Sequence, residues 1–545
     1  MDAIICAGLA AFENWAMLTC DGLSRTSIIV ILFFLHYVPL KYYRIFLYHQ
    51  YFSPYRHLPG PTNNHFFLGQ SINFIRASSP TELYVQWMRE WPDAPMIRYL
   101  SFANTEVLVC NSLNSYKDVL QTNCYSFKKP DTWRKITGMI TGQGLLVLEF
   151  DEHCAHRKMV ASPFSAPSTR KLEPVFQEKA KEVAELFDRA ITAGNGKIGN
   201  VNVTDTFTKF TLDIVGRTVL GKDLNNLRST SFASEGGKST DDGEYTFYQA
   251  YASIFSQGAL GNALLFANGF VPVRWLPLKA NRNFLYGTSW LNNVLRELIR
   301  TRIAEITTST SSKNVDSLES RDLMTFIVEE SMPGGPAEGL LEENFLGHIL
   351  QFMGAGVDTS SNMLAWSSHI FATQQDVQDT LRAEIMELLD KSPSPSFAEI
   401  DKLPYLTWFI KEALRVYPPA ASIHRQAVTD LVIDGVHVSK DTTVDVVFSV
   451  AMLNPLVWGE DADKVDPTRW GRLTEAQQSP HAFSPFSNGP RICIGRHFAM
   501  VEIKTVLVEM LSHYRFLSVE KPFVCENPSF VLKPTGLEVS IEKIH

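Results

Sequence analysis

The sequence predicts a mainly α-helical protein with small β-sheets, preceded by an N-terminal membrane-anchor helix. Three observations lead to this prediction. The segment from Gly22 to Leu40 is apolar and contains Arg25 as its one charged residue. Further along the chain, long stretches place apolar residues at helical spacing, most clearly from Leu341 to about Thr373. Short runs that alternate apolar and polar residues lie among these stretches and are typical of small sheets.

The composition is that of a large globular protein. Hydrophobic residues make up 45% and charged residues 20% of the 545 residues, which is enough for a sizeable core. The formal net charge of -8 gives no electrostatic argument for a nucleic-acid partner, so we expect none. The seven cysteines are scattered and odd in number. That pattern favours a reducing compartment over a disulfide framework.

The apolar segment at the N-terminus is just long enough to span a bilayer, which needs about 20 residues. Lys41 and Arg44 follow the segment, whereas Asp2, Glu13 and Asp21 precede it. The positive-inside rule then predicts a single-pass protein of the endoplasmic reticulum membrane with the bulk of the chain in the cytosol. The alternatives are a buried N-terminal helix and, for the first 20 residues, a position in the bilayer surface.

A stiff hinge is predicted directly after the anchor. Three prolines and a glycine between Ser53 and Pro61 exclude a continuous helix there. We therefore divide the chain into residues 1–50, the membrane anchor with its flanking segment, and residues 51–545, the folded domain.

The elements expected within the domain follow in chain order. A helix is predicted over residues 405–417 and is ended by two prolines. Strands are predicted over residues 431–438 and 442–450, because these segments alternate in polarity. A further helix is predicted over residues 495–514, immediately after a cysteine.

That cysteine, Cys493, lies in an unusual local sequence. A thiolate is the form that binds a metal, and the N-terminus of the following helix favours its charge. Gly489 and Gly495 allow a close backbone approach to a bulky group, Phe486 can pack over the sulfur, and Arg491 is placed to meet an anionic part of the ligand. A lone cysteine argues against tetrahedral zinc and favours haem held by one protein thiolate.

The pattern F-x-x-G-x-R-x-C-x-G over residues 486–495 matches the haem-binding loop of the cytochrome P-450 superfamily at every defined position. The chain resembles a microsomal, fungal-type member of that superfamily from about Tyr55 to the C-terminus. The resemblance implies the cytochrome P-450 fold for residues 51–545. It also implies haem b (iron protoporphyrin IX) as the cofactor, with Cys493 as the axial ligand of the iron.

A second motif lies on the helix predicted over residues 405–417. Glu412 and Arg415 are three residues apart and share a helix face, so the two side chains can pair. Taken alone, such a pair is usually a solvated surface pair of little energetic consequence. The segment VDPTRW adds Arg469, which matches the superfamily's second arginine. The resemblance implies a buried structural network of Glu412, Arg415 and Arg469, although Trp470 replaces the family's commoner phenylalanine.

A third motif, AGVDTS, begins at Ala355 in the middle of an apolar helical pattern. Its Gly356 costs a helix about 1 kcal/mol relative to alanine. A helix with a harmless polar patch is the plain alternative. With haem implied, the resemblance assigns Ala355 and Gly356 to making room for haem, oxygen and substrate. It assigns Asp358 and Thr359 to a proton relay for splitting O2, with the Thr359 hydroxyl bonding the backbone and opening a local bulge.

The resemblance also implies contacts to the haem propionates, which need charge-assisted partners in an apolar cleft. Arg157 matches the arginine of a helix whose usual tryptophan is His153 in this chain, and imidazole can also donate a hydrogen bond. Arg425 matches a further propionate arginine. The alternative for Arg157 and Arg425 is a position on the surface.

The function implied by the resemblance is a monooxygenase that inserts one atom of O2 into a lipophilic small molecule. Electrons would come from NADPH through NADPH-cytochrome P-450 reductase, docked near the basic residues Arg496 and Lys158. The apolar stretch from Ala259 to Leu278 predicts membrane contact and substrate access, or else a buried core segment. The fungal character favours a substrate from specialised metabolism, a polyketide or a terpenoid.

Two other functions remain as alternatives. One is a haem-thiolate isomerase or dehydratase of the same fold, which needs no external electrons. Asp358 and Thr359 argue against it, because such chemistry needs no proton relay for O2. The other is a haem-binding protein without catalysis, which predicts no substrate-dependent consumption of NADPH.

Overall fold

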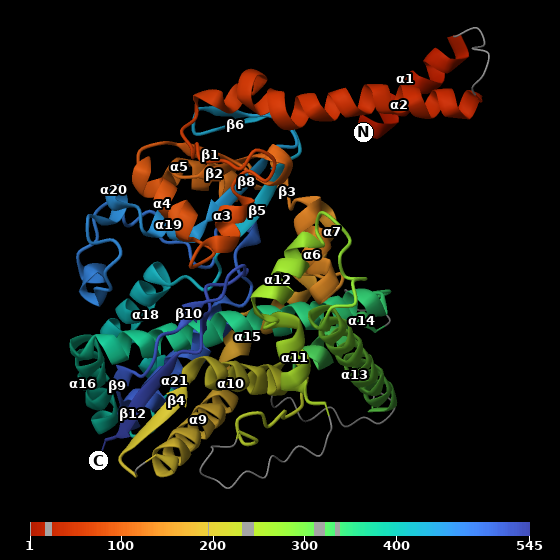
Figure 1. Ribbon diagram of the computed structural model, residues 1–545. Coiled ribbons are helices and arrows are strands. Elements are labelled where there is room, and N and C mark those ends of the chain that lie inside the picture. The colour runs from red at the N-terminus through yellow and green to blue at the C-terminus, as the bar shows by residue number, and fades with distance from the viewer. Residues whose placement is uncertain are drawn as a thin grey trace.

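The computed structural model describes residues 2–16, 24–194, 196–230, 245–309, 322–332 and 338–544, and it is mainly helical with small sheets (Figure 1). The helices are α1 (Asp2–Ala16), α2 (Arg25–Tyr42), α3 (Ser71–Arg76), α4 (Glu82–Glu90), α5 (Leu113–Lys117), α6 (Asp131–Thr141), α7 (Phe150–Val160), α8 (Ala166–Arg170), α9 (Glu173–Ala193), α10 (Val203–Thr218), α11 (Phe247–Phe255), α12 (Gly258–Ala267), α13 (Lys279–Ser309), α14 (Leu323–Ser331), α15 (Glu342–Thr373), α16 (Gln375–Lys391), α17 (Phe397–Ile400), α18 (Pro404–Val416), α19 (Phe448–Met452), α20 (Pro455–Trp458) and α21 (Arg496–His513).

The strands are β1 (Met96–Leu100), β2 (Glu106–Cys110), β3 (Phe127–Lys128), β4 (Ile198–Asn202), β5 (Ser422–Ala427), β6 (Leu431–Ile433), β7 (Val436–Val438), β8 (Thr443–Val447), β9 (Tyr514–Val519), β10 (Val524–Cys525), β11 (Pro534–Thr535) and β12 (Glu538–Lys543). The largest sheet has the order β1-β2-β8-β5-β3, in which β2 and β8 are parallel and the other pairs antiparallel. A three-stranded sheet has the order β4-β12-β9, and two hairpins pair β6 with β7 and β10 with β11.

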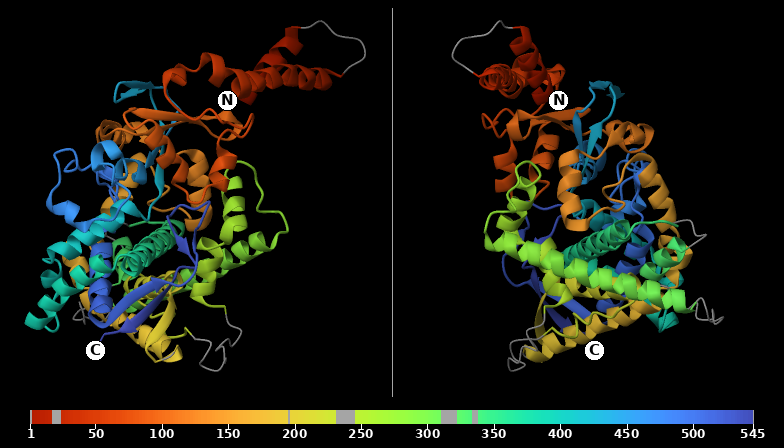
Figure 2. Two further views of the ribbon diagram at one scale, coloured as in Figure 1. Left: turned by 60° about the vertical axis from the view of Figure 1, so that its left-hand side comes forward. Right: turned by 90° about the vertical axis from the view of Figure 1, so that its right-hand side faces the viewer.

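The N-terminal helices lie outside the body of the protein, at the end opposite the C-terminus (Figure 2). The continuous helical segment Arg25–Phe52 is long and apolar enough to cross a membrane, and its most apolar window is only 6% buried. The alternative of a buried N-terminal helix is therefore wrong. Helix α1 packs along α2 and is fixed by ion pairs of Asp2 with Lys41 and Arg44, at 2.9 and 2.8 Å.

The helix is broken where the hinge is predicted, and this segment is bonded to the folded domain. A short 3-10 turn at Pro54–His57 ends the long helical segment. The tyrosine hydroxyl of Tyr55 lies 2.8 Å from the Thr442 hydroxyl next to β8. Side chains of the β1–β2 hairpin also bind the last turns before the hinge, because Arg98 donates to the carbonyl of His49 at 2.7 Å. The direction of the helical segment Arg25–Phe52 is thus set by hydrogen bonds to the domain.

Helix α15 runs through the middle of the domain (Figure 1) and joins its two largest hydrophobic clusters. Residues such as Phe371 in its last turns pack with α9, α18 and α21, whereas residues such as Met353 nearer its start pack with α6, α10 and α11. The predicted helix from Leu341 to Thr373 is confirmed almost to the residue. Because α15 is buried on most sides, the polar groups in its middle are held in fixed surroundings.

Two sequence-based expectations change in detail. The strand predicted over residues 442–450 ends at Val447, and Phe448–Met452 forms the helix α19, because the alternation of polarity stops there and every residue of α19 is buried. The apolar stretch from Ala259 to Leu278 was open to two interpretations, and it divides between them. Leu265 is buried in the core, whereas Trp275 is 76% exposed.

Candidate active site

The loop that carries Cys493 is held in place by its own backbone and by glycine. The Cys493 N–H donates to the carbonyl of Phe486 at 2.8 Å. Gly489 has a φ of +70°, and a Cβ there would lie 2.2 Å from the carbonyl oxygen of Leu120, so the position requires glycine. Helix α21 begins one residue after Gly495. The loop therefore presents the sulfur at the start of a helix, as the sequence predicts.

Cys493 combines an accessible surface with a deep position. The residue is exposed, yet burial raises the pKa of its thiol. The N–H of Gly495 and the charges of Arg157 and Arg496 act in the opposite direction. The sulfur is thus open to a ligand but surrounded by protein, and the nearby donors favour the thiolate that binds a metal.

Helix α7 places Arg157 and His153 beside this loop. One nitrogen of Arg157, Nη2, donates to the carbonyl of Ile492 at 2.6 Å, next to the cysteine. His153 is buried, and its Nδ1 has no hydrogen-bond partner among the residues that the structure describes. Burial, with the charges of Lys129 and Arg491, lowers the pKa of His153 to about 4, so the imidazole is neutral near pH 7 and keeps one N–H to donate.

A group of buried cations lies next to His153. The Nη2 of Arg491 donates to Glu149 at 2.6 Å, while its Nε and Nη1 are buried without partners. Arg425, on β5, is 6% exposed, and burial lowers the pKa of its guanidinium to about 10. Lys129 lies 3.3 Å from the same Glu149 carboxylate and donates to the carbonyl of Leu148, and burial lowers its pKa to about 7.

These residues fit an anionic cofactor. Arg491, Arg425 and Lys129 form ion pairs or charge interactions with the single carboxylate of Glu149 among the described residues. Buried N–H donors without partners cost about 1–3 kcal/mol each, and more when charged. The two propionates of a haem would supply the missing acceptors and charge at Arg491 and Arg425. The predicted propionate residues are thus brought together, and the surface alternative for Arg425 is wrong.

Lys129 and Glu149 were missed by sequence reasoning. They lie in the segment around α6 and α7, whereas Arg425 and Arg491 come from distant parts of the chain. Only the fold places Glu149 next to Arg491, and no spacing in the sequence marks that pair. A buried lysine beside a proline, as in the run Lys128-Lys129-Pro130, gave no signal either, because two adjacent lysines usually lie in solvent.

The middle of α15 has one accessible face. Ala355 is exposed and Gly356 and Thr359 are partly exposed, although Gly354 and the residues from Val357 to Asp358 are buried. The Thr359 hydroxyl donates to the carbonyl of Ala355 at 2.7 Å, as predicted. The helix nevertheless stays α-helical through this turn, so the predicted bulge is absent; the hydroxyl adds a bond to the carbonyl without displacing the backbone. A Cβ on Gly356 would meet Val215 only at 3.5 Å, an ordinary contact.

Asp358 points to another side of α15 than Thr359. It is buried, and no hydrogen bond joins the two side chains in the part of the chain that the structure describes. Burial raises the pKa of Asp358, and Lys533, whose Nζ lies 4.0 Å from Oδ1, acts in the opposite direction. The two predicted relay residues are thus neighbours in sequence with separate surroundings.

Glu502 on α21 is a second buried carboxyl near this helix that the sequence analysis did not single out. Burial raises its pKa to about 8, and it interacts with Ser360 on α15. Its Oε2 has no hydrogen-bond partner. The sequence feature that could have identified it is a glutamate among the apolar residues of the helical pattern over residues 495–514.

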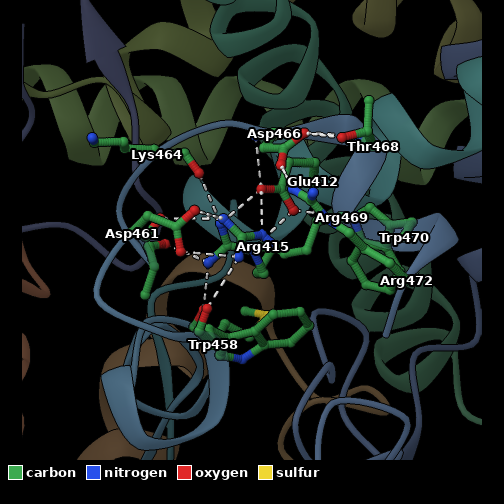
Figure 3. Close-up of polar contacts among 12 residues, drawn as sticks. Glu412, Arg415, Trp458, Asp461, Lys464, Asp466, Thr468, Arg469, Trp470 and Arg472 are labelled. Carbon is green, nitrogen blue, oxygen red and sulfur yellow. Dashed lines mark hydrogen bonds and ion pairs between the residues drawn. The ribbon is translucent and has the colours of Figure 1, made fainter. Parts of the chain in front are cut away.

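The predicted network of Glu412, Arg415 and Arg469 is present and buried (Figure 3). Arg415 binds Glu412 through two bonds of 2.9 and 2.8 Å, and both side chains are 0% exposed. The Nε of Arg469 donates to the same carboxylate at 3.3 Å. Trp470, the departure from the family pattern, donates its indole N–H to Glu412 at 3.0 Å. The departure therefore adds a bond to the network.

Comparisons with known proteins agree with this site. The family model described as Cytochrome P450 matches residues 58–541. The cytochrome P450 monooxygenase sphH of Aspergillus fumigatus is 28% identical over 94% of this chain and 92% of its own length. The cytochrome P450 monooxygenase FUM15 of Gibberella moniliformis is 26% identical over 86% of this chain and 83% of its own.

A solved structure supports the fold. The crystal structure of the cytochrome P450DA heme domain superposes with a TM-score of 0.72 at 20% identity, over 90% of this chain and 98% of that one. The match of the family model spans almost the whole folded domain and includes the loop around Cys493. This chain belongs to the cytochrome P450 family and is a monooxygenase with a haem cofactor.

Proposed function

We propose that this cytochrome P450 inserts one oxygen atom from O2 into a lipophilic small molecule and reduces the other atom to water, using electrons from NADPH. The observation that carries the proposal is the middle of α15. There Thr359, whose hydroxyl is accessible, directly follows Asp358, whose carboxyl is buried, in the sequence. A protein that only bound haem, or rearranged a substrate, would need no acid and hydroxyl at this place.

The side chains around the cofactor have separate roles in the proposal. Cys493 binds the haem iron through its thiolate. Arg491 and His153 hold the propionates with nitrogens that have no partner among the described residues, and Arg425 and Lys129 add positive charge. When bound, haem supplies an iron centre that activates O2, and the thiolate's electron donation favours cleavage of the O–O bond.

The remaining residues position the cofactor and move protons. Arg157 fixes the loop through the carbonyl of Ile492 and has further donors for a propionate. Ala355 and Gly356 leave space beside α15 for oxygen and substrate. Asp358 takes up a proton from the interior of the protein. On the accessible face of α15, Thr359 orients the group that receives this proton from Asp358. The bond from Thr359 to the carbonyl of Ala355 holds its hydroxyl in one orientation.

The exposed apolar surface favours a lipophilic substrate and a membrane location. Leu260, Phe270, Val271 and Trp275 are each more than half exposed and lie within the segment 259–278. Isolated patches of this kind mark sites of membrane contact or ligand access. Together with the apolar segment Arg25–Phe52, they support an enzyme held on the endoplasmic reticulum membrane with its catalytic domain in the cytosol.

The electron donor in the proposal is NADPH-cytochrome P450 reductase. Arg496 follows the haem loop and Lys158 lies on α7, and both are exposed. Arg496 lies close enough to Cys493 to lower the pKa of its thiol, and both side chains offer positive charge to an acidic partner. The fungal origin of similar monooxygenases supports a substrate from specialised metabolism, such as a polyketide or a terpenoid.

The test is turnover of the full chain with the reductase in phospholipid vesicles. Candidate polyketides and terpenoids are supplied with NADPH and O2 labelled with heavy oxygen. The proposal expects substrate-dependent NADPH consumption and a product that carries one labelled oxygen atom. Product formed without NADPH would favour the isomerase or dehydratase alternative. Haem binding without any NADPH consumption would favour the non-catalytic alternative.

A further inference from the structure

Lys533 is an ammonium group enclosed by the protein between two carboxylates. It lies directly before β11, in the hairpin that begins with β10, and is 5% exposed. Its Nζ lies 4.0 Å from Oδ1 of Asp358 and 3.9 Å from Oε2 of Glu526, and it donates to the Ser256 hydroxyl at 2.6 Å. Lysine is rarely buried unless it is paired, so these carboxylates account for its position.

The groups that face this cluster come from α11, its C-cap residue and α12. Tyr251 on α11 interacts with Asp358, and Asn262 on α12 donates to Glu526 at 2.6 Å. Ser256 caps the end of α11. The charged or titratable groups facing Asp358 are therefore Lys533, Glu526 and Tyr251, among the residues that the structure describes.

The pKa values of the Asp358 and Glu526 carboxyls are shifted by the same two effects. Burial raises the pKa of Asp358 and of Glu526, and the positive charge of Lys533 lowers both. Among the described residues, the Oδ1 of Asp358 is buried without a hydrogen-bond partner of ordinary geometry, and Tyr251 lies close enough to the carboxyl to lower its pKa. An acid of this kind exchanges a proton more readily than a carboxylate locked in a full set of hydrogen bonds, because no bond must break first.

The three ionisable groups lie one after another between the β10–β11 hairpin and α15. Asp358 is buried at the side of α15, next to the residue whose hydroxyl is accessible. Lys533 is buried between the two acids. The Glu526 side chain is 9% exposed, and it lies two residues from Val524, which is 66% exposed. The three ionisable groups therefore lead from the outer part of the hairpin to the middle of α15.

We propose that Glu526, Lys533 and Asp358 form the path by which protons reach Asp358, with Lys533 as the positioning residue that holds the Asp358 carboxylate. The inference rests on the proposed function, in which Asp358 relays protons. Lys533 gives one ammonium proton to the Asp358 carboxylate and receives one from the Glu526 carboxyl, which takes a proton from solvent. One proton enters for each that leaves, and no electrons move.

The distances set how the transfer occurs. Gaps of 3.9 and 4.0 Å are longer than a hydrogen bond, so a bridging water or a small rotation of the lysine side chain completes each step. The competing interpretation is that the cluster only pins the hairpin to α15. In that case removing the charge would loosen the structure without changing how protons are delivered.

The experiment measures what fraction of the NADPH electrons leaves as hydrogen peroxide. The haem-loaded full chain is reconstituted with reductase in phosphatidylcholine vesicles, and the peroxide released per NADPH is followed over pH without added substrate. Incomplete proton delivery releases peroxide in place of water. The variants are Lys533→Met, Lys533→Arg and Glu526→Gln. Lys504→Met is the matched control, because Lys504 is also buried and ion-paired, but to Asp401.

We expect Lys533→Met to raise the peroxide fraction and to move its pH dependence upward by about 1 to 3 pH units, the effect of an opposite charge at this distance on a carboxyl pKa. Lys533→Arg keeps the charge and therefore the wild-type pH dependence, but its peroxide fraction stays raised, because a guanidinium does not give up a proton. Glu526→Gln also raises the peroxide fraction, and adding it to Lys533→Met has no further effect, since both act on one path. Lys504→Met leaves the profile unchanged.

An unshifted profile in Lys533→Met overturns the inference, as does a change confined to folding or substrate affinity. If Lys533→Met does not retain haem, Glu526→Gln decides alone, and a wild-type peroxide fraction in that variant overturns the path. The proposed function fails separately, when the wild-type chain consumes no NADPH with reductase present. Wild-type turnover with unaffected variants therefore removes this inference and leaves the monooxygenase proposal standing.

Discussion

The Nη2 of Arg491 donates to Glu149, whereas its Nε and Nη1 are buried without partners among the described residues. This residue illustrates how single side chains prepare the site. An unsatisfied buried donor is unfavourable unless a ligand provides the acceptor. Arg425 adds a second buried cation close by. At the scale of residues, an anionic cofactor would therefore stabilise the site by supplying the acceptors that Arg491 lacks among the described residues.

The first prediction concerns Arg491. Replacing it by methionine (Arg491→Met) removes a charge-assisted bond to the cofactor, which is worth about 1.5–3 kcal/mol, so haem affinity should fall by about tenfold or more. Transfer of haem to an excess of apomyoglobin measures the change. Arg300→Met is the control, since Arg300 is 67% exposed on α13. Unchanged haem retention in Arg491→Met would remove this residue from the cofactor site.

The second prediction concerns Thr359. Thr359→Ala should divert electrons from product to hydrogen peroxide, because the hydroxyl that orients the proton is lost. Thr373→Ala is a close control: Thr373 lies on the same helix and makes the same bond to the carbonyl four residues earlier, at 2.8 Å, but it is exposed. The peroxide released per NADPH is the readout. Fully coupled product formation in Thr359→Ala would rule out the relay role.

Among the elements, α15 and α18 show what a sequence does and does not predict. The long apolar period of α15 and the prolines that follow α18 predict their bounds closely, because these signals are local. The pairing of Glu412 with Arg415 is local as well. Trp470 joins the same carboxylate from a segment more than 50 residues away, and Glu149 meets Arg491 across more than 300 residues. Such contacts depend on the complete fold, so no local pattern predicts them.

The third prediction tests the network at the end of α18. Glu412→Gln leaves the buried guanidinium of Arg415 without a carboxylate, whereas Arg469 keeps its ion pair with Asp461. Breaking a buried ion pair in this way costs about 3–5 kcal/mol, so the free energy of unfolding should fall by that amount. Denaturant unfolding monitored by the haem absorbance measures it.

The matched control is Glu387→Gln on α16. Glu387 pairs with Lys391 at 2.7 Å, but both side chains are 71% exposed. Solvent screens such a pair, so the midpoint of unfolding should stay where it is. Equal losses of stability in the two variants would show that the Glu412 network is no stronger than a surface pair.

For the whole molecule, the anchor and the folded domain meet at hydrogen bonds that a division at residue 50 would cut. Arg98 and Asn104 donate to carbonyls of His49 and Ile45, so the last turns of the long helical segment belong structurally to the domain. The composition of the sequence indicated an anchor and a hinge, but the attachment depends on side chains of the β1–β2 hairpin. The boundary that preserves these bonds lies after Tyr42.

The fourth prediction follows from that boundary. A chain lacking residues 2–42 should fold, bind haem and lose its resistance to alkaline extraction from membranes. It should remain peripherally bound through the exposed apolar side chains around Trp275. Membrane fractionation before and after alkaline washing measures both effects. Retention of the truncated chain as an integral protein would place the anchor elsewhere.

The central claim of the account is that Cys493 binds the haem iron through its thiolate. The most direct test is the absorbance spectrum of the reduced carbon monoxide complex of Cys493→Ser, compared with Cys154→Ser, whose cysteine is exposed on α7. The account predicts that Cys493→Ser loses the long-wavelength band of a thiolate-bound haem and that Cys154→Ser keeps it. Survival of that band in Cys493→Ser would contradict the account.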